Sequence, residues 1–247
     1  MSETNSQRIA IVTGAASGIG RAIAEDLRDR GMTVGALDVG ADVPDGCAPL
    51  IADVRDGEQV RAAIDAFAKQ HGRLDLLVGN AGVSLVGTIE DNDEADWQRT
   101  FDVNVFGQFR VVRAALPWLR ESDAASIVLM SSCSATNGIP QRAVYSASKG
   151  AVQSLTAALA VDLLPENIRV NAVSPATVDT PFMAELIARV DDPAAHRRSL
   201  EARQPTGRMI TPTEIATAVA YLADPNNRNV TGTTLIIDGG MATLRPV

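Results

Sequence analysis

Two kinds of segment alternate along almost the whole chain, and this alternation restricts the fold more than any other feature. Short apolar segments rich in Val and Ile are typical of buried strands, and they occupy residues 8–13, 33–38, 49–53, 74–79, 126–131, 168–174 and 234–237. Segments with helical periodicity lie between them, at residues 18–30, 57–71, 93–120, 144–164 and 212–223. The alternation predicts a doubly wound α/β fold, with helices on both faces of a seven-stranded parallel sheet.

The chain has 247 residues and no repeat or linker that would separate a second domain. We therefore expect residues 1–247 to form one domain, preceded only by a flexible polar tail at residues 1–7. Residues 176–210 depart from the alternation, because several prolines surround two short helical patches, one of them apolar at 182–190. A long excursion of this kind is typical of a substrate-binding loop or lid.

Charge and cysteine content narrow the class of partner. The net charge of −8 comes without a basic cluster, so nucleic acid and anionic membranes would be repelled. The start lacks the order of a secretory signal, and no stretch reaches the roughly 18 to 20 apolar residues of a membrane span. Cys47 and Cys133 are far apart, which favours a reducing, cytoplasmic compartment. His71 and His196 are isolated, so we expect no metal site.

A glycine-rich segment joins the first predicted strand to the first predicted helix. It contains Gly14, Ser17, Gly18, Ile19 and Gly20. Glycines at such a junction let backbone N–H groups and the positive end of a helix approach a pyrophosphate closely. The alternative is an ordinary strand-to-helix turn, but the order of strand, glycines and helix favours a Rossmann-type dinucleotide site.

Asp38 ends the second predicted strand, 18 residues after Gly20. A carboxylate at this place accepts hydrogen bonds from the ribose hydroxyls of the adenosine and repels a 2′-phosphate. Because neither residues 15–17 nor residues 39–40 include Arg or Lys, the local charge favours NAD over NADP. The alternative for Asp38 is a turn residue at the start of a loop.

Three polar side chains are candidates for the chemistry. Tyr145 and Lys149 stand four residues apart on a predicted helix, so they share one face, and an ammonium beside a phenol favours the phenolate. Without further motifs, such a pair is more often an amphipathic surface pair. Ser132 lies at the carboxyl end of a predicted strand, where its hydroxyl would steady a reacting oxygen, with Ser131 and Ser134 as nearby competitors.

Together with further motifs, these residues resemble the short-chain dehydrogenase/reductase family. The resemblance covers essentially the whole chain, through Thr13-Gly14-x-x-x-Gly18-x-Gly20, Asp53-Val54, Asn80-Ala81-Gly82, Asn104, Ser132, Tyr145-x-x-x-Lys149, Pro175 to Thr180 and residues 231–240. It implies an enzyme that transfers a hydride between NAD(H) and a secondary alcohol or ketone. Family members are commonly homotetramers, built from helices that correspond to residues 102–120 and 144–164.

The resemblance also implies roles for single residues. Tyr145 would be the general acid/base, and Lys149 would also hold the nicotinamide ribose. Ser132 would orient the substrate, and Asn104 would anchor a water that links Lys149 to solvent. The cofactor contacts would extend to the adenine and the nicotinamide carboxamide through Asp53, Val54, Asn80, Ala81, Gly82, Pro175, Val178 and Thr180.

Two positions depart from the family pattern. Residue 79 is Gly where Asn is common, and residue 176 is Ala where the family usually has Gly. An alanine at position 176 would be strained if its φ were positive and harmless if its φ were negative.

The substrate side of the site contains two arginines. Arg142 precedes Tyr145 by three residues and Arg203 lies in the predicted lid, so both are candidates to bind a substrate carboxylate. The stretch from Thr177 to Arg208 is similar to dehydrogenases of 2-keto-3-deoxy sugar acids and to the cytosolic type of 3-hydroxybutyrate dehydrogenase. This similarity implies a small hydroxy acid or sugar acid. The alternative is that both arginines form ordinary surface ion pairs.

Two other functions remain open from sequence. A protein of this fold can bind a dinucleotide as a sensor without turnover, because a fold does not establish a function. An NADP-dependent carbonyl reductase is the second alternative, although it would have to bind a 2′-phosphate beside Asp38.

Overall fold

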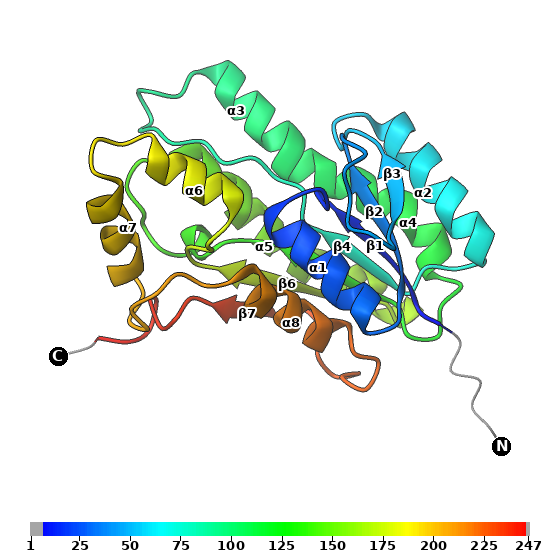
Figure 1. Cartoon of the computed structure of the whole chain (residues 1–247). Coiled ribbons are helices and arrows are strands. Elements are labelled where there is room, and N and C mark those ends of the chain that lie inside the picture. Colours follow the sequence, from blue (N-terminus) through cyan, green and yellow to red (C-terminus); the bar gives the residue numbers. More distant parts are fainter. Residues whose placement is uncertain (1–6, 246–247) are drawn as a thin grey trace.

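The computed structural model describes residues 7–245, so the expected tail at residues 1–7 lies, apart from Gln7, outside the described residues. Seven parallel strands form one sheet in the order β3-β2-β1-β4-β5-β6-β7 (Figure 1). Their bounds are β1 Ile9–Thr13, β2 Thr33–Asp38, β3 Ala48–Ile51, β4 Leu76–Gly79, β5 Ser126–Met130, β6 Arg169–Pro175 and β7 Thr234–Ile237. The predicted seven-stranded, doubly wound Rossmann-type fold is confirmed.

The central strands are apolar on both faces because helices cover both sides of the sheet. In β1 every residue is buried, with Ile9 and Ile11 in one core and Ala10 and Val12 in the other. Successive side chains of a strand point to opposite faces, so one apolar run supplies both cores.

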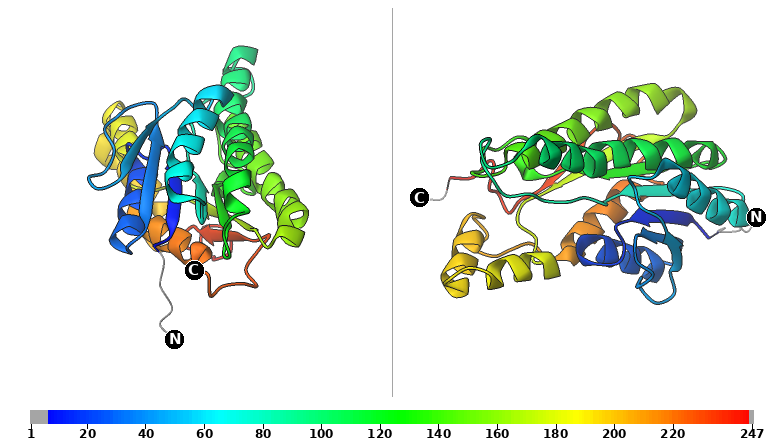
Figure 2. Two further views of the ribbon diagram at one scale, coloured as in Figure 1. Left: turned by 90° about the vertical axis from the view of Figure 1, so that its right-hand side faces the viewer. Right: turned by 90° about the horizontal axis from the view of Figure 1, so that it is seen from above.

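Two helices cover one face of the sheet and three cover the other (Figure 2). On the first face lie α1 (Gly18–Asp29) and α8 (Pro212–Ala223), whose buried side chains join Val128 and Val173 in one core. On the second face lie α2 (Gly57–His71), α4 (Gly107–Leu119) and α5 (Ala143–Leu163). Short 3₁₀ turns follow β5 at Cys133–Ala135 (η2) and α5 at Leu164–Glu166 (η3).

The helix expected at residues 93–120 is interrupted. It consists of α3 (Glu94–Phe101), a π-helical turn η1 (Asp102–Phe106) and α4. Asn104 lies inside the turn and is fully buried, with its carboxamide bonded to the backbone of Val83. A π-turn inserts one extra residue into a helix and is frequent at functional sites. The sequence does not predict this π-turn, because the helical periodicity of apolar residues continues before and after it.

The strand order reverses between β1 and β4, and ligands of such sheets bind beyond the carboxyl ends of the strands at that point. The two helical patches expected within residues 176–210 are α6 (Pro181–Ala188) and α7 (Pro193–Ala202). Figures 1 and 2 show them projecting past this end of the sheet. A small cluster of Ile187, Leu200 and Met209 packs within this segment.

Candidate active site

The loop between β1 and α1 has the shape of a phosphate cradle. Gly14 and Gly18 have φ values of +66° and +55°, in the left-handed region that favours glycine. A Cβ on Gly20 would lie 2.0 Å from the carbonyl oxygen of Gly14, so only glycine allows the helix to start this close to the loop. Ser17 is the N-cap of α1, but its side chain caps no backbone N–H. The cradle and the open helix end therefore fit a pyrophosphate.

Asn80 connects this cradle to the end of β4. Its amide donates hydrogen bonds to the carbonyl oxygens of Thr13 and Gly14, at 2.9 and 3.3 Å. The Thr13 hydroxyl accepts from the N–H groups of Asn80 and Ala81, at 2.9 and 3.0 Å. These hydrogen bonds hold the loop after β1 against the loop after β4, at the point where the strand order reverses.

The departure at residue 79 has a steric explanation. A Cβ on Gly79 would lie 2.0 Å from the amide oxygen of Gln108 on α4. The Gln108 side chain thus fills the space of a side chain at position 79, and its amide donates to the Ala81 carbonyl at 3.3 Å. The loop after β4 is supported by α4 instead of by residue 79.

The Asp38 carboxylate stands at the end of β2, beside the cradle. It accepts hydrogen bonds from the N–H of Ala16 at 3.0 Å and from the N–H of Val39 at 2.8 Å. Both bonds hold a negative charge at the edge of the loop. Arg21 is the cation nearest in sequence to the cradle, and its guanidinium is engaged by Asp42 and Glu25.

Asp53 and Val54 follow β3 at the same end of the sheet. The Asp53 carboxylate forms an ion pair with Arg55 at 2.5 Å, and this hydrogen bonding lowers the pKa of Asp53. The Val54 side chain is buried and its carbonyl accepts from Arg110.

Asn104, Ser148 and Tyr145 form a hydrogen-bonded chain. The Asn104 amide donates to the Val83 carbonyl at 2.9 Å and to the Ser148 hydroxyl at 3.0 Å. Ser148 in turn donates to the Tyr145 carbonyl at 2.7 Å. A Cβ on Gly82 would lie 3.2 Å from the Asn104 oxygen and 3.5 Å from the Lys149 nitrogen, so both groups border Gly82.

Ser132 and Tyr145 lie together, as the sequence predicts. Burial raises the pKa of the Tyr145 phenol, and the neighbouring Ser132 hydroxyl opposes this shift with a smaller effect. Ser134 donates to the Ser132 hydroxyl at 3.1 Å, and Ser131 is bonded to the Lys149 carbonyl instead. Of the three neighbouring serines, Ser132 is therefore the one at the phenol.

Lys149 is almost completely buried, and burial lowers its pKa to about 8. Its ammonium donates to the Met130 carbonyl at 2.7 Å and lies 5.8 Å from the centre of the Tyr145 ring. In this structure the cation that lowers the pKa of Tyr145 is Arg142, whose guanidinium carbon is 6.0 Å from the same ring.

Arg142 is half-buried and its charge has no carboxylate partner among residues 7–245. It donates to the Ser84 hydroxyl at 2.7 Å and to the Leu85 carbonyl at 3.4 Å. Burial lowers the pKa of Arg142, and the like charge of Arg203 lowers it further. The charge of Arg203, at the end of α7, is therefore close enough to repel that of Arg142.

The loop after β6 brings the last predicted residues to the cradle. Pro175 ends β6, and Ala176 donates to the Ile237 carbonyl without a positive φ, so the alanine is unstrained. Val178 pairs with Ile210 in a parallel bridge. Thr180 caps α6, and a Cβ on Gly18 would lie 3.5 Å from its methyl group.

Sequence reasoning missed Ser84, Ser148 and Gln108. Each supports a predicted site residue through a contact between distant segments. A serine or glutamine in a helix or loop carries no local signal of such a role. Ser148 is the one with a partial signal in the sequence, because it lies between Tyr145 and Lys149 on the same helix.

A parallel sheet with a phosphate cradle at its reversal point and a Ser-Tyr-Lys cluster beside it defines a class of α/β oxidoreductases that use a dinucleotide. A family model described as enoyl-(acyl carrier protein) reductase matches residues 14–242. Cis-4-hydroxycyclohexanecarboxylate dehydrogenase of Sinomonas cyclohexanicum is 38% identical, over 97% of this chain and 98% of its own. The 2-keto-3-deoxy-L-fuconate dehydrogenase of Xanthomonas campestris pv. campestris is 37% identical, over 93% of this chain and 78% of its own.

The chain belongs to the short-chain dehydrogenase/reductase family. The ligand-free aldohexose dehydrogenase of Thermoplasma acidophilum has a TM-score of 0.92 at 37% identity, covering 98% of this chain and 96% of its own. A 3-ketoacyl-(acyl-carrier-protein) reductase from Brucella melitensis, complexed with NADH, has a TM-score of 0.87 at 30% identity, covering 95% and 98%. The chain is therefore an oxidoreductase that transfers a hydride between a nicotinamide dinucleotide and a secondary alcohol or ketone.

No helix within residues 7–245 has both the length and the apolar character needed to cross a bilayer. In the same residues, no three or more His, Cys, Asp or Glu side chains gather in a way that would hold a metal ion.

Proposed function

We propose that this chain is an NAD-dependent dehydrogenase of small hydroxy acids. Tyr145 would exchange the hydroxyl proton, Ser132 would orient the reacting oxygen, and Arg142 would bind the carboxylate together with Arg203. The observation that carries the proposal is the half-buried guanidinium of Arg142, which has no carboxylate partner among the described residues. A desolvated charge without a partner is costly, so an anionic ligand is the natural complement.

The residues of the cradle fit the dinucleotide. Gly14, Gly18 and Gly20 leave the space that a pyrophosphate needs, and α1 presents its uncapped N-terminus there. Thr180 borders the cradle, because a Cβ on Gly18 would lie 3.5 Å from its methyl group, and Thr180 and Val178 would hold the carboxamide end. When bound, the nicotinamide supplies the hydride chemistry.

The preference for NAD rests on the charge of Asp38. Its carboxylate is fixed by the N–H groups of Ala16 and Val39 and faces the edge of the cradle. The nearby Arg21 is engaged by acidic side chains and offers no free cation for a 2′-phosphate. A phosphate placed there would meet like charge, whereas ribose hydroxyls would donate to the carboxylate.

The proton would leave the site along the chain's own hydrogen bonds. Tyr145 would take the proton from the substrate hydroxyl, with Ser132 donating to the same oxygen. Lys149 and the Asn104 carboxamide both border Gly82, so a water between them would connect the buried ammonium to the Val83 loop. Asn104 would act as a positioning residue for that water.

Helices α6 and α7 would form the substrate lid. Asp179, at the base of the lid, is ion-paired with Arg197 on α7 at 2.6 Å. The small cluster of Ile187, Leu200 and Met209 lies entirely within this segment. We therefore expect a loosely attached lid on a single domain that spans residues 1–247.

The chain would assemble as a homotetramer through α4 and α5. Phe106, Phe109, Val161 and Leu164 are large apolar side chains that are exposed on these helices or at their ends. Aromatic side chains that are exposed together mark interaction sites. Light scattering coupled to gel filtration should give about four times the monomer mass of 26.0 kDa.

The protein would be located in the cytoplasm. Both cysteines are unpaired, which is compatible with a reducing compartment.

The decisive experiment compares cofactors and substrates with the wild type and two variants. Rates of oxidation should be higher with NAD than with NADP, and higher for 3-hydroxybutyrate than for 2-butanol. Arg142→Met should lower kcat/KM for the acid by roughly 10- to 100-fold, because a charged hydrogen bond contributes about 1.5–3 kcal/mol. Arg228→Met, at an exposed arginine distant in sequence, is the matched control.

Tyr145→Phe separates an enzyme from a dinucleotide sensor. The variant should lose turnover and still bind NADH, measured by the fluorescence of the bound cofactor. An acid preference that survives Arg142→Met would refute the carboxylate assignment, and a higher efficiency with NADP would refute the role of Asp38.

A further inference from the structure

Two cations lie at nearly equal distances from the ring of Tyr145. The Lys149 ammonium is 5.8 Å from the ring centre, and the Arg142 guanidinium carbon is 6.0 Å from it. Arg142 is the N-cap of α5, and Tyr145 and Lys149 lie on the first two turns of this helix. Helical side chains lean toward the N-terminus, so Tyr145 leans toward the turn that Arg142 begins. Either cation is therefore close enough to stabilise a phenolate at Tyr145.

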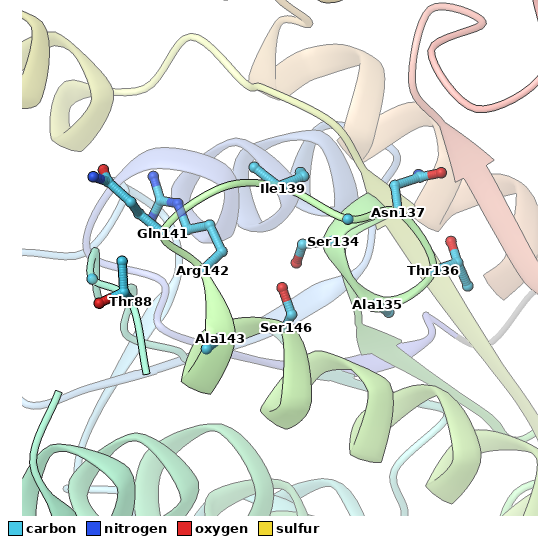
Figure 3. A pocket seen from close by; sticks show the side chains of 12 residues that line it. Thr88, Ser134, Ala135, Thr136, Asn137, Ile139, Gln141, Arg142, Ala143 and Ser146 are labelled. Atoms are coloured by element: carbon cyan, nitrogen blue, oxygen red, sulfur yellow. The ribbon is translucent and has the colours of Figure 1, made fainter. Parts of the chain in front are cut away.

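Arg142 is fixed in place by the segment that follows β4. Its guanidinium donates to the Ser84 hydroxyl at 2.7 Å and to the Leu85 carbonyl at 3.4 Å. The Gly87 N–H donates to the Gln141 carbonyl at 2.9 Å, and Gly87 pairs with Arg142 in a parallel bridge. Figure 3 shows Arg142 at the wall of an open pocket, directly before the first turn of α5. Neutral oxygens hold the guanidinium, so these contacts leave its positive charge uncancelled.

Lys149 is the weaker partner of a phenolate, because it loses its proton first. Burial lowers the pKa of Lys149 to about 8, whereas tyrosine normally titrates near about 10 and burial raises the pKa of Tyr145. In the cofactor-free protein the lysine is therefore mostly neutral at a pH at which the phenol ionises. Burial lowers the pKa of Arg142 and the charge of Tyr145 raises it. A guanidinium, which normally titrates above about 12, keeps its charge in that range.

The other groups that face the phenol come from the loop after β5. Burial raises the pKa of Tyr145, the Ser132 hydroxyl and the Arg142 charge oppose this shift, and Cys133 adds to it. The Cys133 thiol is neutral near neutral pH, because burial raises its own pKa. Two further charged groups act on these neighbours, namely Arg203 on Arg142 and Asp238 on Cys133. Among residues 7–245, Arg142 is thus the cation beside the phenol whose charge persists when the phenol ionises.

We propose that Arg142 stabilises the Tyr145 phenolate during catalysis, in addition to its contact with a substrate carboxylate. The proposal rests on the proposed function, because it requires Tyr145 to exchange the proton. In the oxidation, the substrate O–H bond breaks and its proton forms the O–H bond of Tyr145, while the carbinol carbon gives its hydride to NAD and becomes the ketone carbon. The phenol has to be ionised before this step, and a fixed cation increases its ionised fraction at a given pH.

The pH dependence of 2-butanol oxidation tests this role without a substrate carboxylate. In the wild type, kcat/KM with NAD should fall at low pH, where Tyr145 is protonated. Arg142→Gln removes the charge and keeps a donor for Ser84, so the midpoint of this fall should move to higher pH by about one to two units. Below the midpoint, kcat/KM should fall about tenfold for each unit. Arg142→Lys keeps a charge and should stay nearer to the wild type, and the exposed Arg228→Met is the control.

A spectroscopic titration measures the same ionisation without turnover. The chain has two tyrosines, and Tyr221 is exposed on α8. Tyr221→Phe therefore leaves Tyr145 as the one source of phenolate absorbance. In this background, without cofactor, the absorbance should appear at a pH about one to two units higher with Arg142→Gln than without it. Arg142→Met, which is also neutral, takes the place of Arg142→Gln if circular dichroism shows that the latter does not fold.

The outcomes separate the inference from the proposed function. If Arg142→Gln shifts neither titration, or if Arg142→Lys shifts them as far as Arg142→Gln, the inference is wrong. A raised KM for 3-hydroxybutyrate would in that case still support the carboxylate anchor. If both titrations shift while kcat/KM falls equally for the acid and for 2-butanol, the inference stands and the anchor fails. Full turnover of Tyr145→Phe would remove the basis of both.

Discussion

Gly79 at the end of β4 faces the side chain of Gln108 on α4 so closely that a Cβ on Gly79 would lie 2.0 Å from the Gln108 amide oxygen. The oxygen is buried and has no hydrogen-bond partner in the described part of the chain. Glycine at position 79 is therefore required by glutamine at position 108. The Gln108 amide donates to the Ala81 carbonyl and so supports the loop that faces the cofactor cradle.

The first prediction concerns this pair. Gly79→Ala should lower the free energy of unfolding by about 1–3 kcal/mol, because the added methyl group overpacks the contact. Gln108→Ala opens the same space, so the double variant should recover part of the loss. Urea unfolding of the four proteins in a double-mutant cycle gives the coupling energy. Strictly additive effects would contradict the steric explanation.

The second prediction concerns the cradle. Gly20→Ala should weaken NADH binding strongly and destabilise the fold, because its Cβ would lie 2.0 Å from the Gly14 carbonyl. Gly57→Ala is the matched control, since a Cβ there makes only ordinary contact with Arg110 at 3.8 Å. Fluorescence titration with NADH and thermal unfolding are the measurements. Equal effects of the two substitutions would argue against a steric cradle at Gly20.

The third prediction concerns Ser84, which holds the Arg142 guanidinium at 2.7 Å. Because Ser84 positions Arg142, its loss should weaken the binding of acids without changing the rate of the chemical step. Ser84→Ala should raise KM for 3-hydroxybutyrate roughly threefold to tenfold, the effect of one lost hydrogen bond, with little change in kcat. The values for 2-butanol should stay constant. A fall in kcat for both substrates would point instead to a general structural defect.

The fourth prediction concerns the buried Lys149. Its pKa of about 8 lies below the value of an exposed lysine, so the unfolded chain holds a proton that the folded chain has lost between about pH 8 and 10.5. Stability rises with pH wherever the unfolded state binds more protons. In this window the cofactor-free wild type should therefore gain on the order of 3 kcal/mol relative to Lys149→Met. Urea unfolding of both proteins at several pH values measures the difference, and a constant difference would show that burial does not depress this pKa.

Much of the fold followed from local sequence patterns. Strands such as Ile9–Thr13 are recognisable because parallel sheets bury both faces of a strand, which requires a continuous apolar run. Gly14, Gly18 and Gly20 are recognisable because a phosphate loop needs glycine at a fixed place between strand and helix. These requirements act within a few residues, so they appear in the sequence itself.

Other features depended on contacts between distant segments. The apolar pattern around Asn104 is the same in a π-turn as in an α-helix, so it does not predict the π-turn. The turn coincides with a hydrogen bond between Asn104 and the N–H of Val83, 21 residues away. The sequence left the φ of residue 176 open, and only the path of the chain after β6 showed that alanine is unstrained there.

What the sequence by itself determined is the layout of the sheet, the place of the cofactor cradle and the set of candidate side chains. Only the tertiary structure decided how those side chains are used: Arg142 is held by Ser84 across 58 positions, and Asn80 is bonded to the Thr13 carbonyl across 67 positions. The physical reason is range. Backbone propensity and apolar periodicity are local, whereas charge pairing, burial and cavity shape arise only after remote segments pack together.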